Sequence, residues 1–307
     1  MSEPVIFHFK KPGLQTMVQD LGRVGFQAFG VPTSGVMDKS SAKIANWLVG
    51  NPRENPVLEI TLLGPQIEIK GNCQIALTGG NLSPTLNGNP IPMYETIQVD
   101  SGSILSFGRK LGGCRTYLAI RGKWQIKKWL GSYSASAHSG LELTPDSIIQ
   151  KNSSLQVLSQ LPISKRLYSK EQRPIYSRSV RVRVLPGPEF DSFSPLAIGH
   201  FFSRGYQLTP DSNRMGYRLD GQIKDFNPKR EVISSGIIPG TIQITNSGQP
   251  IILLADAQTT GGYFRLVNVI SHDLDKLAQL MPGDEVWFSL ISLEEAKEAL
   301  KEEKLLF

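Results

Sequence analysis

The sequence predicts a mainly β protein with a few short helices. Apolar, β-branched and aromatic residues gather in many short segments, and Gly, Pro, Asn and Asp bound these segments at short intervals. That texture favours sandwiches or barrels over alternating strand–helix units. Apolar content of 40% and charged content of 20% over 307 residues indicate a globular chain that can bury one large or two ordinary cores.

The predicted strands fall into two runs. The first run comprises residues 58–63, 66–69, 74–77, 97–99, 104–107 and 116–120. Leu86-Asn-Gly-Asn-Pro90 is a tight-turn signal between two of these strands. The second run comprises residues 180–185, 231–233, 241–244, 251–254, 264–269 and 285–290. A faint internal repeat between the two runs suggests two related β-barrels in tandem.

Few segments show helical periodicity. Residues 40–49 are the strongest helix, with Asp38 or Ser40 as the N-cap and Gly50 as the stop. Short helices are expected at 195–202 and 272–280, and an amphipathic, charged helix at 293–306.

A polar, basic and weakly patterned segment from Ser159 to Ser179 marks a domain boundary. We therefore expect an N-terminal domain over 1–160, a basic linker over 161–179 and a C-terminal domain over 180–307. Seven Lys or Arg residues between 165 and 183 carry much of the net charge of +6. They form either a solvated surface or a patch that faces a phosphate or a partner protein. No aromatic ladder or recognition motif accompanies them, so no nucleic-acid partner is expected.

Several classes of function lack their motifs. Cys73 and Cys114 form no C-x-x-C, and the four histidines show no metal-binding spacing, so no metal is expected. The fragment Arg121-Gly-Lys123 lacks the upstream Gly of a P-loop. No G-x-S-x-G elbow, signal peptide or membrane span is evident. These features predict a cytoplasmic protein that acts on a small molecule.

The stretch Leu254-Ala-Asp-Ala-Gln-Thr-Thr-Gly-Gly-Tyr263 is the strongest candidate site, because it places polar groups at the end of a buried strand. Asp256 is a candidate general base or hydrogen-bond anchor, and its alternative role is a buried carboxylate that binds loop amides. The candidate substrate-binding residues here are Thr259, Thr260, Gly261, Gly262 and Tyr263, with Gln243 as a further polar tip.

Arg214 and Arg218 lie four residues apart among turn-forming residues. Their fork-shaped side chains could clamp a carboxylate or a carboxylated intermediate. The alternative is that they form structural ion pairs with a neighbouring Asp211, Asp220 or Asp225.

Two residues of the first half join the candidate site. Asn81 ends Thr78-Gly-Gly-Asn81, where its amide can both donate to and accept from a planar amide or ureido group. Asp38 follows a compact Gly-rich loop and is either a substrate-binding residue or only the cap of the helix that follows.

These segments, in this order, resemble the family known as allophanate hydrolase subunit 2, biotin-dependent carboxyltransferase, or the C subunit of the prokaryotic ATP-dependent 5-oxoprolinase. The matching pieces are Gln19-Asp-Leu-Gly-Arg-Val-Gly25, Gly35-Val-Met-Asp38, Ala45-Asn46, Leu58-Glu-Ile-Thr61, Arg214-Met-Gly-Tyr-Arg-Leu219, Ser234 through Gln243, Asp256 and Thr259-Thr-Gly-Gly-Tyr263. The resemblance runs from about Gly13 to Phe288.

The resemblance implies two cyclophilin-like β-barrels with a shared site. It also implies a component of a 5-oxoprolinase that opens 5-oxoproline to glutamate at the expense of ATP, with B-like and A-like subunits as partners. The alternatives are transfer of a carboxyl group from carboxybiotin to urea or a urea-like amide, and a non-catalytic regulator that binds a kinase inhibitor. The chain has no lysine in an Ala-Met-Lys-Met context, so any biotin would arrive on a separate carrier.

The chain departs from the family after Leu130-Gly-Ser132. Tyr133 replaces the usual Arg, and the segment 134–150 looks shortened. If this loop lines the pocket, the departure bears on the substrate.

Overall fold

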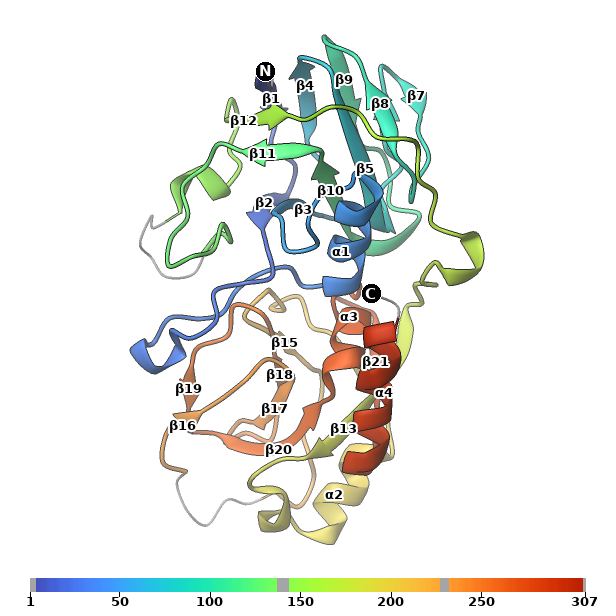
Figure 1. Ribbon diagram of the computed structural model, residues 1–307. Coiled ribbons are helices and arrows are strands. Elements are labelled where there is room, and N and C mark those ends of the chain that lie inside the picture. The colour runs from blue at the N-terminus through green and yellow to red at the C-terminus, as the bar shows by residue number, and fades with distance from the viewer. Residues whose placement is uncertain (1–3, 137–143, 227–231, 306–307) are drawn as a thin grey trace. The chain divides into compact units, whose positions relative to one another are not determined.

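The computed structural model of the protein describes residues 4–136, 144–226 and 232–305 (Figure 1). Strands dominate, and the helices are few and short, so the predicted mainly β class with a few short helices is confirmed. The chain forms two compact units. The first contains residues up to Arg23 together with Ser34–Tyr176, and the second contains Val24–Thr33 together with Ser177–Phe307. The predicted division into an N-terminal domain over 1–160, a basic linker over 161–179 and a C-terminal domain over 180–307 stays a prediction.

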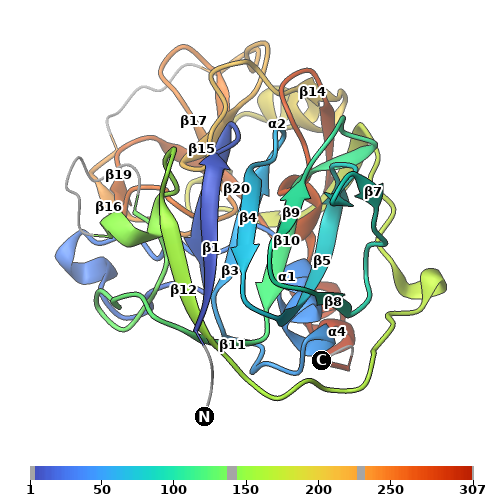
Figure 2. The same cartoon turned by 90° about the horizontal axis from the view of Figure 1, so that it is seen from above.

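The first unit is built from two sheets. One has the order β11-β12-β1-β4-β9-β6-β7, and several of its strands lie side by side in Figure 2. Its strands are β1 (Pro4–Lys11), β4 (Gln66–Lys70), β6 (Thr85–Leu86), β7 (Asn89–Pro90), β9 (Ser103–Ser106), β11 (Gly122–Trp124) and β12 (Ser154–Ser159). The other has the order β2-β3-β10-β5-β8. Its strands are β2 (Gln15–Gln19), β3 (Val57–Thr61), β5 (Cys73–Asn81), β8 (Ile97–Val99) and β10 (Gly112–Ile120).

The core of the first unit joins the inner faces of these sheets. Val5, Phe7 and Phe9 alternate along β1 and are buried, as expected of a strand with one face on a core. β3, β5 and β10 are buried along nearly their whole length, since α1 (Lys39–Leu48) packs on them as well. This burial on both faces explains why apolar residues follow one another in these strands without strict alternation, as in residues 75–77 and 117–120.

The second unit has one large sheet with the order β14-β21-β13-β20-β17-β18-β15, and β13 and β21 pair in parallel. Its strands are β13 (Ser179–Pro186), β14 (Tyr206–Gln207), β15 (Gly216–Arg218), β17 (Thr241–Ile244), β18 (Pro250–Leu253), β20 (Phe264–Val269) and β21 (Glu285–Leu290). A two-stranded ribbon joins β16 (Ser235–Gly236) to β19 (Thr260–Gly261). Stacked rings of Phe201 and Phe288, 4.8 Å apart, fix α2 (Pro195–Phe202) against β21.

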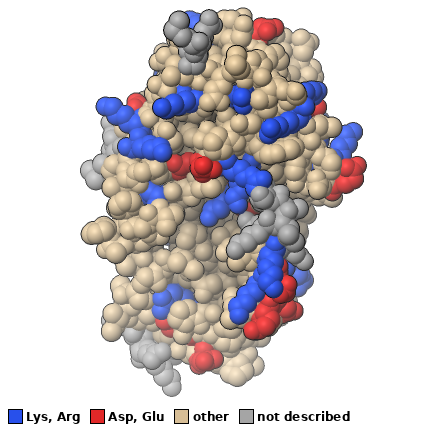
Figure 3. Space-filling model, viewed as in Figure 1, with Lys and Arg blue, Asp and Glu red and all other residues tan. Residues whose placement is uncertain are grey.

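Two further helices belong to the second unit, α3 (Leu274–Leu277) and α4 (Leu293–Leu305). Over α4, cationic and anionic side chains lie next to one another (Figure 3), as the charged helix predicted there implies. No helix in the described ranges combines the length and the apolar character that a membrane span needs.

Several predicted bounds differ from those observed. The strand predicted at 231–233 is wrong for Val232 and Ile233, which form no strand, while Glu231 lies outside the described residues. Ile233 is 90% exposed, so its strand-favouring side chain packs on nothing. The strand predicted to end at Leu77 continues through Thr78–Asn81, and the helix predicted over 272–280 is confined to α3 after one turn of 3-10 helix. The sequence patterns do not predict β1, β2 or β12.

The segment expected to be a linker packs on the first unit. Gln74 and Ile163 exchange two hydrogen bonds, because the Gln74 side chain donates to the Ile163 carbonyl at 2.8 Å and accepts its N–H at 2.9 Å. Further along, the Arg166 N–H donates to Thr96, and the Arg166 guanidinium stacks on the Trp47 ring. These contacts give some of the basic residues of this segment a structural role.

The carboxylate of Asp273 predicts a pH dependence of stability. Burial alone would raise its pKa, but hydrogen bonds from the side chain and backbone of Arg183 and from Lys276 outweigh burial and hold the pKa of Asp273 well below its usual range. Because the folded pKa is depressed, this contribution is present above about pH 4 and is lost as the pH falls through the folded value. We expect Asp273→Asn to lower the urea midpoint of unfolding at pH 7. The difference in midpoint between the variant and the unsubstituted protein should become smaller below about pH 4. A gap that stays constant between about pH 7 and pH 3 would contradict this assignment.

Candidate functional site

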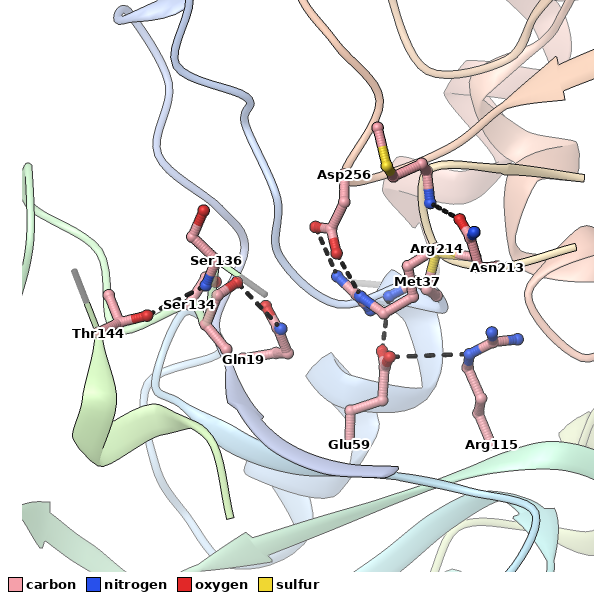
Figure 4. Close-up of polar contacts among 12 residues, drawn as sticks. Gln19, Met37, Glu59, Arg115, Ser134, Ser136, Thr144, Asn213, Arg214 and Asp256 are labelled. Carbon is pink, nitrogen blue, oxygen red and sulfur yellow. Dashed lines mark hydrogen bonds and ion pairs between the residues drawn. The ribbon is translucent and has the colours of Figure 1, made fainter. Parts of the chain in front are cut away.

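In the second unit, Arg214 and Asp256 form a buried ion pair (Figure 4). Arg214 Nε and Nη2 donate to the two carboxylate oxygens of Asp256 at 2.8 and 3.1 Å. The residues are only 1% and 3% exposed, and the Asp256 N–H also donates to the Arg214 carbonyl at 3.0 Å. Arg214 and Asp256, which the sequence marks as separate candidates, therefore form one fixed ion pair.

β15 and β18 bring this pair together. Gly216 pairs with Leu253 in the antiparallel ladder, so the residues just before β15 meet those just after β18. The sequence offers Asp211, Asp220 or Asp225 as structural partners for the arginines. Instead, Asp220 pairs with Arg204 at 3.2 Å, on the surface.

Arg218 does not join this pair. It ends β15, where its neighbour Tyr217 is buried and Arg218 itself is exposed. Arg214 is buried and holds Asp256, whereas Arg218 is exposed, so the structure does not show the two arginines as a clamp around one ligand. A role for Arg218 in substrate binding stays a prediction.

The residues that follow Asp256, here called the polar tip (residues 258–260), line a cavity of about 630 Å³ within the second unit. Thr259 and Thr260 line it, while Gly261, Gly262 and Tyr263 follow along β19 and beyond. The other lining residues are Gln27, Ala28, Gly30, Pro32, Thr33, Gly236, Ile237, Ile238, Pro239, Ala255, Ala257 and Gln258. Alanines 255 and 257 flank Asp256, so the ion pair lies directly behind the cavity wall.

Gln243 supports the same tip from β17. It is 1% exposed, and its amide nitrogen has no hydrogen-bond partner among the described residues. A Cβ built on Gly261 would lie 2.5 Å from that nitrogen, so the absence of a side chain at Gly261 lets the Gln243 amide approach the backbone. A buried donor without a partner is costly. Gln243 is not among the residues that line the cavity, so its role here is to pack beneath Gly261.

In the first unit, Asp38 and Asn81 have local partners. Asp38 caps α1 by accepting the N–H and the hydroxyl of Ser41 at 2.8 and 2.7 Å, which is the alternative that the sequence offers. The Asn81 side-chain oxygen accepts the Ser83 N–H at 2.8 Å and forms a turn after β5. The Asn81 amide nitrogen is the part of this side chain that could still reach a substrate.

Sequence reasoning misses a buried polar cluster on β3 and β10. Glu59 is fully buried, and its carboxylate accepts the Met37 N–H at 2.8 Å and the Tyr117 hydroxyl at 2.9 Å. Arg115 Nε lies 3.7 Å from the same carboxylate (Figure 4). Tyr117 sits opposite Glu59 in the ladder, and Arg115 shares its face two residues before. Burial first, and the charge of Glu59 second, raise the pKa of Tyr117 well above its usual value, so its hydroxyl remains a donor.

A second set of hydroxyls lies close to Asp38. Tyr94 accepts the Gly79 N–H at 3.0 Å, and its hydroxyl lies 3.2 Å from that of Tyr176, which in turn lies 3.3 Å from that of Ser41. Burial raises the pKa of Tyr94 to about 12 and raises the pKa of Tyr176 further. Both phenols therefore stay neutral at physiological pH and can relay hydrogen bonds but not charge.

The departure at Tyr133 falls on a loop that Asp20 organises. Asp20 accepts hydrogen bonds from the hydroxyls of Ser132 and Ser134 and from the Tyr133 N–H, at 2.6 to 2.7 Å. Ser136 donates its N–H to Thr144 at 3.0 Å, and the part of the predicted departure over 137–143 lies outside the described residues. Since Tyr133 itself contributes its backbone here, replacement of the family's Arg leaves the Asp20 anchor in place.

Among the described residues, no group of three or more His, Cys, Asp or Glu side chains is placed to hold a metal ion. Each unit instead offers a buried carboxylate next to an arginine, Glu59 with Arg115 and Asp256 with Arg214. Such pairs present fixed hydrogen-bonding groups without a net charge, an arrangement suited to orienting a neutral amide.

Known proteins resemble this chain over almost its full length. It is 35% identical to the 5-oxoprolinase C subunit of Escherichia coli, over 97% of this chain and 95% of that one. The protein of the same name from Haemophilus influenzae is 34% identical, over 91% and 89% of the two chains. The urea amidolyase of Saccharomyces cerevisiae is 34% identical over 98% of this chain, which spans only 17% of that protein.

Solved structures agree with these matches. The urea amidolyase of K. lactis superposes with a TM-score of 0.88 and 33% identity over 98% of this chain, which corresponds to 19% of that protein. The protein TTHA0988 matches with a TM-score of 0.83 and 30% identity, over 94% of this chain and 56% of its own. A family model for the carboxyltransferase domain, subdomain A and B, matches residues 29–290. The chain belongs to this carboxyltransferase family.

Proposed function

We propose that this chain is the C subunit of a cytosolic ATP-dependent 5-oxoprolinase, which converts 5-oxoproline, ATP and water to glutamate, ADP and phosphate. The observation that carries the proposal is the two-way coverage of the match. The chain and the 5-oxoprolinase C subunit of E. coli match over 97% and 95% of their lengths, whereas the chain spans only a small part of the urea amidolyases. A protein of this kind requires partners, which we take to be B-like and A-like subunits.

The chemistry assigned to the chain is recognition of a cyclic amide. An unstrained lactam resists water, so its carbonyl must be activated, and ATP supplies that activation within the complex. The nearest fragment to a P-loop, Gly122-Lys123, lies in β11 and pairs with β12. It is therefore a strand and not a phosphate-binding loop.

The cavity beside Thr259 and Thr260 would hold the ring in this proposal. At about 630 Å³ it has room for a five-membered lactam, and the hydroxyls of Thr259 and Thr260 offer donors for a carbonyl oxygen. Asp256, fixed by Arg214, would position the polar wall or accept a proton. Asn81 and Arg218 are proposed to bind polar groups of the substrate or of its activated form.

The test is to co-express the chain with its neighbouring subunits and to measure glutamate formed from 5-oxoproline and ATP. Omission of this chain should abolish the activity. Asp256→Asn should lower kcat/KM by about 100-fold or more if Asp256 acts in acid–base chemistry. The matched control is Asp220→Asn, which changes a surface carboxylate and should leave the activity unchanged. Full activity without this chain would refute the proposal.

A second candidate is carboxyl transfer from carboxybiotin to a urea-like amide, favoured by the carboxyltransferase model and by the superposition on the urea amidolyase. The cavity has room for the ureido head group, which Thr259, Thr260 and Gln258 would hold by hydrogen bonds. Carboxybiotin on a separate carrier would supply the activated carboxyl group and leave as biotin. Inhibition of the complex by avidin, with no glutamate formed from 5-oxoproline, would support this second function over the first.

A further inference from the structure

A second cavity of about 630 Å³ lies in the second unit, away from the polar tip described above. None of its lining residues lines the first cavity, and none belongs to the Arg214–Asp256 pair. They are His200, Arg204, Gly221, Gln222, Lys224, Ser247 and Gln249. These residues come from the end of α2 and the turn after it, from the loop that follows β15, and from the loop that joins β17 to β18.

Hydrogen bonds between the two loops preform the cavity. The Ile223 N–H donates to the Gly248 carbonyl at 2.9 Å, and the Gln249 side chain donates to the Leu219 carbonyl at 3.0 Å. The Ser247 hydroxyl lies 2.9 Å from that of Thr245, within the same turn. The two loops therefore keep this arrangement without a bound ligand.

The charge on the lining is positive. Arg204 and Lys224 are cations, and no carboxylate is among the described residues that line the cavity. Asp220 pairs with Arg204 at 3.2 Å, but the two side chains are 42% and 38% exposed, and Asp225 beside Lys224 is exposed as well. Exposed pairs of this kind are weak, so an anion in the cavity can compete for Arg204.

The absence of a side chain at Gly221 leaves room for the Arg204 guanidinium at the cavity. The φ of Gly221 is +74°, and a Cβ built there would lie 2.8 Å from Arg204 Nη1. The guanidinium consequently lies directly against the loop backbone, in a place that a side chain at residue 221 would occupy. Asp220 is held in turn, because it accepts the Gln207 N–H at 2.7 Å.

His200 is part of the lining through its other atoms. Its Nδ1 is shut off from solvent and has no hydrogen-bond partner in the part of the chain that the structure describes, so this nitrogen does not face the open cavity. The groups that could contact an anion there are therefore those of Arg204, Lys224 and Ser247.

We propose that this cavity binds a phosphate-bearing small molecule. Donors come from three segments, with the forked guanidinium of Arg204, the ammonium of Lys224 and the hydroxyl of Ser247. A tetrahedral phosphate offers oxygens in several directions, whereas a carboxylate offers two in one plane. The volume exceeds that of a free phosphate, which favours a phosphate ester such as a nucleotide. The inference does not rest on the reaction that the chain takes part in.

The experiment titrates the isolated full-length chain with inorganic phosphate, ADP and adenosine by calorimetry at fixed ionic strength. Arg204→Gln/Lys224→Gln should weaken phosphate and ADP binding at least about tenfold, because two charge-assisted contacts are lost. The control Lys70→Gln/Lys123→Gln removes the same net charge from exposed positions of the first unit and should bind as the unsubstituted protein does. Arg204→Lys keeps the charge but loses the fork, so a smaller loss is expected.

The outcomes separate the sources of the phosphate. Tighter binding of ADP than of phosphate identifies a nucleotide or similar ester, and equal binding identifies free phosphate. Binding of adenosine as tight as that of ADP, no binding of either anion, or equal losses in the two double variants would overturn the proposal. The melting temperature of each variant shows whether it is folded, and Arg204→Lys provides the comparison if the double variant is not.

Discussion

Replacing Arg214 with methionine is expected to lower the free energy of unfolding by about 3–5 kcal/mol, because it leaves the Asp256 carboxylate buried without its bidentate partner. Both side chains are almost fully buried, so water cannot replace the lost hydrogen bonds. Urea denaturation of the chain, followed by fluorescence, measures the change. The matched control is Arg204→Met, which breaks an exposed ion pair and should cost no more than about 1 kcal/mol.

The double variant Arg214→Met/Asp256→Leu separates stability from function. Replacing both members of a buried pair with apolar side chains of similar volume is often neutral, so much of the lost stability should return. If the pair serves the reaction, glutamate formation in the reconstituted complex remains lost in this stable variant. If the pair only holds the fold, activity returns with stability. A loss below about 1 kcal/mol for Arg214→Met alone would show that the pair is not buried as described.

The Arg214–Asp256 pair shows what the sequence can and cannot predict. The sequence marks both residues as candidate site residues, because each stands among turn formers next to a buried strand. Their pairing cannot be predicted, because the two residues lie 42 positions apart and other acidic residues lie closer to Arg214 in the sequence. Only the register of β15 against β18 decides between these partners, and a strand of three residues carries too little pattern to fix its register.

Strands with a clear pattern are the most predictable part of the fold. β17, β20, β21 and α2 have the predicted bounds, because each is a dense apolar segment between turn or cap residues. Val232 and Ile233 have a strand-like composition but form no strand, so composition misleads there. Local propensity is a weak guide wherever packing is absent.

The cluster around Glu59 leaves a signal in the sequence. Glu59 and Arg115 each interrupt an otherwise apolar strand, and a charge in a buried strand must have a partner. The two strands are adjacent in the sheet, yet nothing local indicates this adjacency, because Tyr117 lies 58 residues from Glu59. A charged residue within an apolar strand is therefore worth treating as half of a buried pair.

Replacing Glu59 with leucine is the second change expected to have a large effect, a loss of about 3–5 kcal/mol in the free energy of unfolding. The substitution leaves the Arg115 guanidinium in a buried site without its carboxylate, and leaves the Tyr117 hydroxyl and the Met37 N–H without their acceptor. The control is Glu68→Leu on β4, where the partner Lys10 is exposed and the pair is 3.6 Å apart. That change should cost no more than about 1 kcal/mol.

Tyr117→Phe tests the same cluster without removing a charge. The hydroxyl donates to Glu59 and accepts the Asp38 N–H, both at 2.9 Å, so its loss removes one donor from the Glu59 carboxylate and the acceptor of the Asp38 N–H, and should cost about 2–4 kcal/mol. The pH dependence has a definite sign. Burial, and then the charge of Glu59, raise the folded pKa of Tyr117, so its contribution is complete below its usual pKa of about 10 and is lost as the pH rises toward the folded value.

The protein should therefore lose stability above about pH 10 more steeply than Tyr117→Phe does, and the difference between them should shrink there. Unfolding curves at about pH 7, 9 and 10.5 measure this difference, and Tyr263→Phe, at an exposed tyrosine, controls for general alkaline effects. Equal slopes for the protein and Tyr117→Phe would mean that the hydroxyl is solvated. The same result would remove the reason to regard Glu59, Arg115 and Tyr117 as one buried hydrogen-bonded unit.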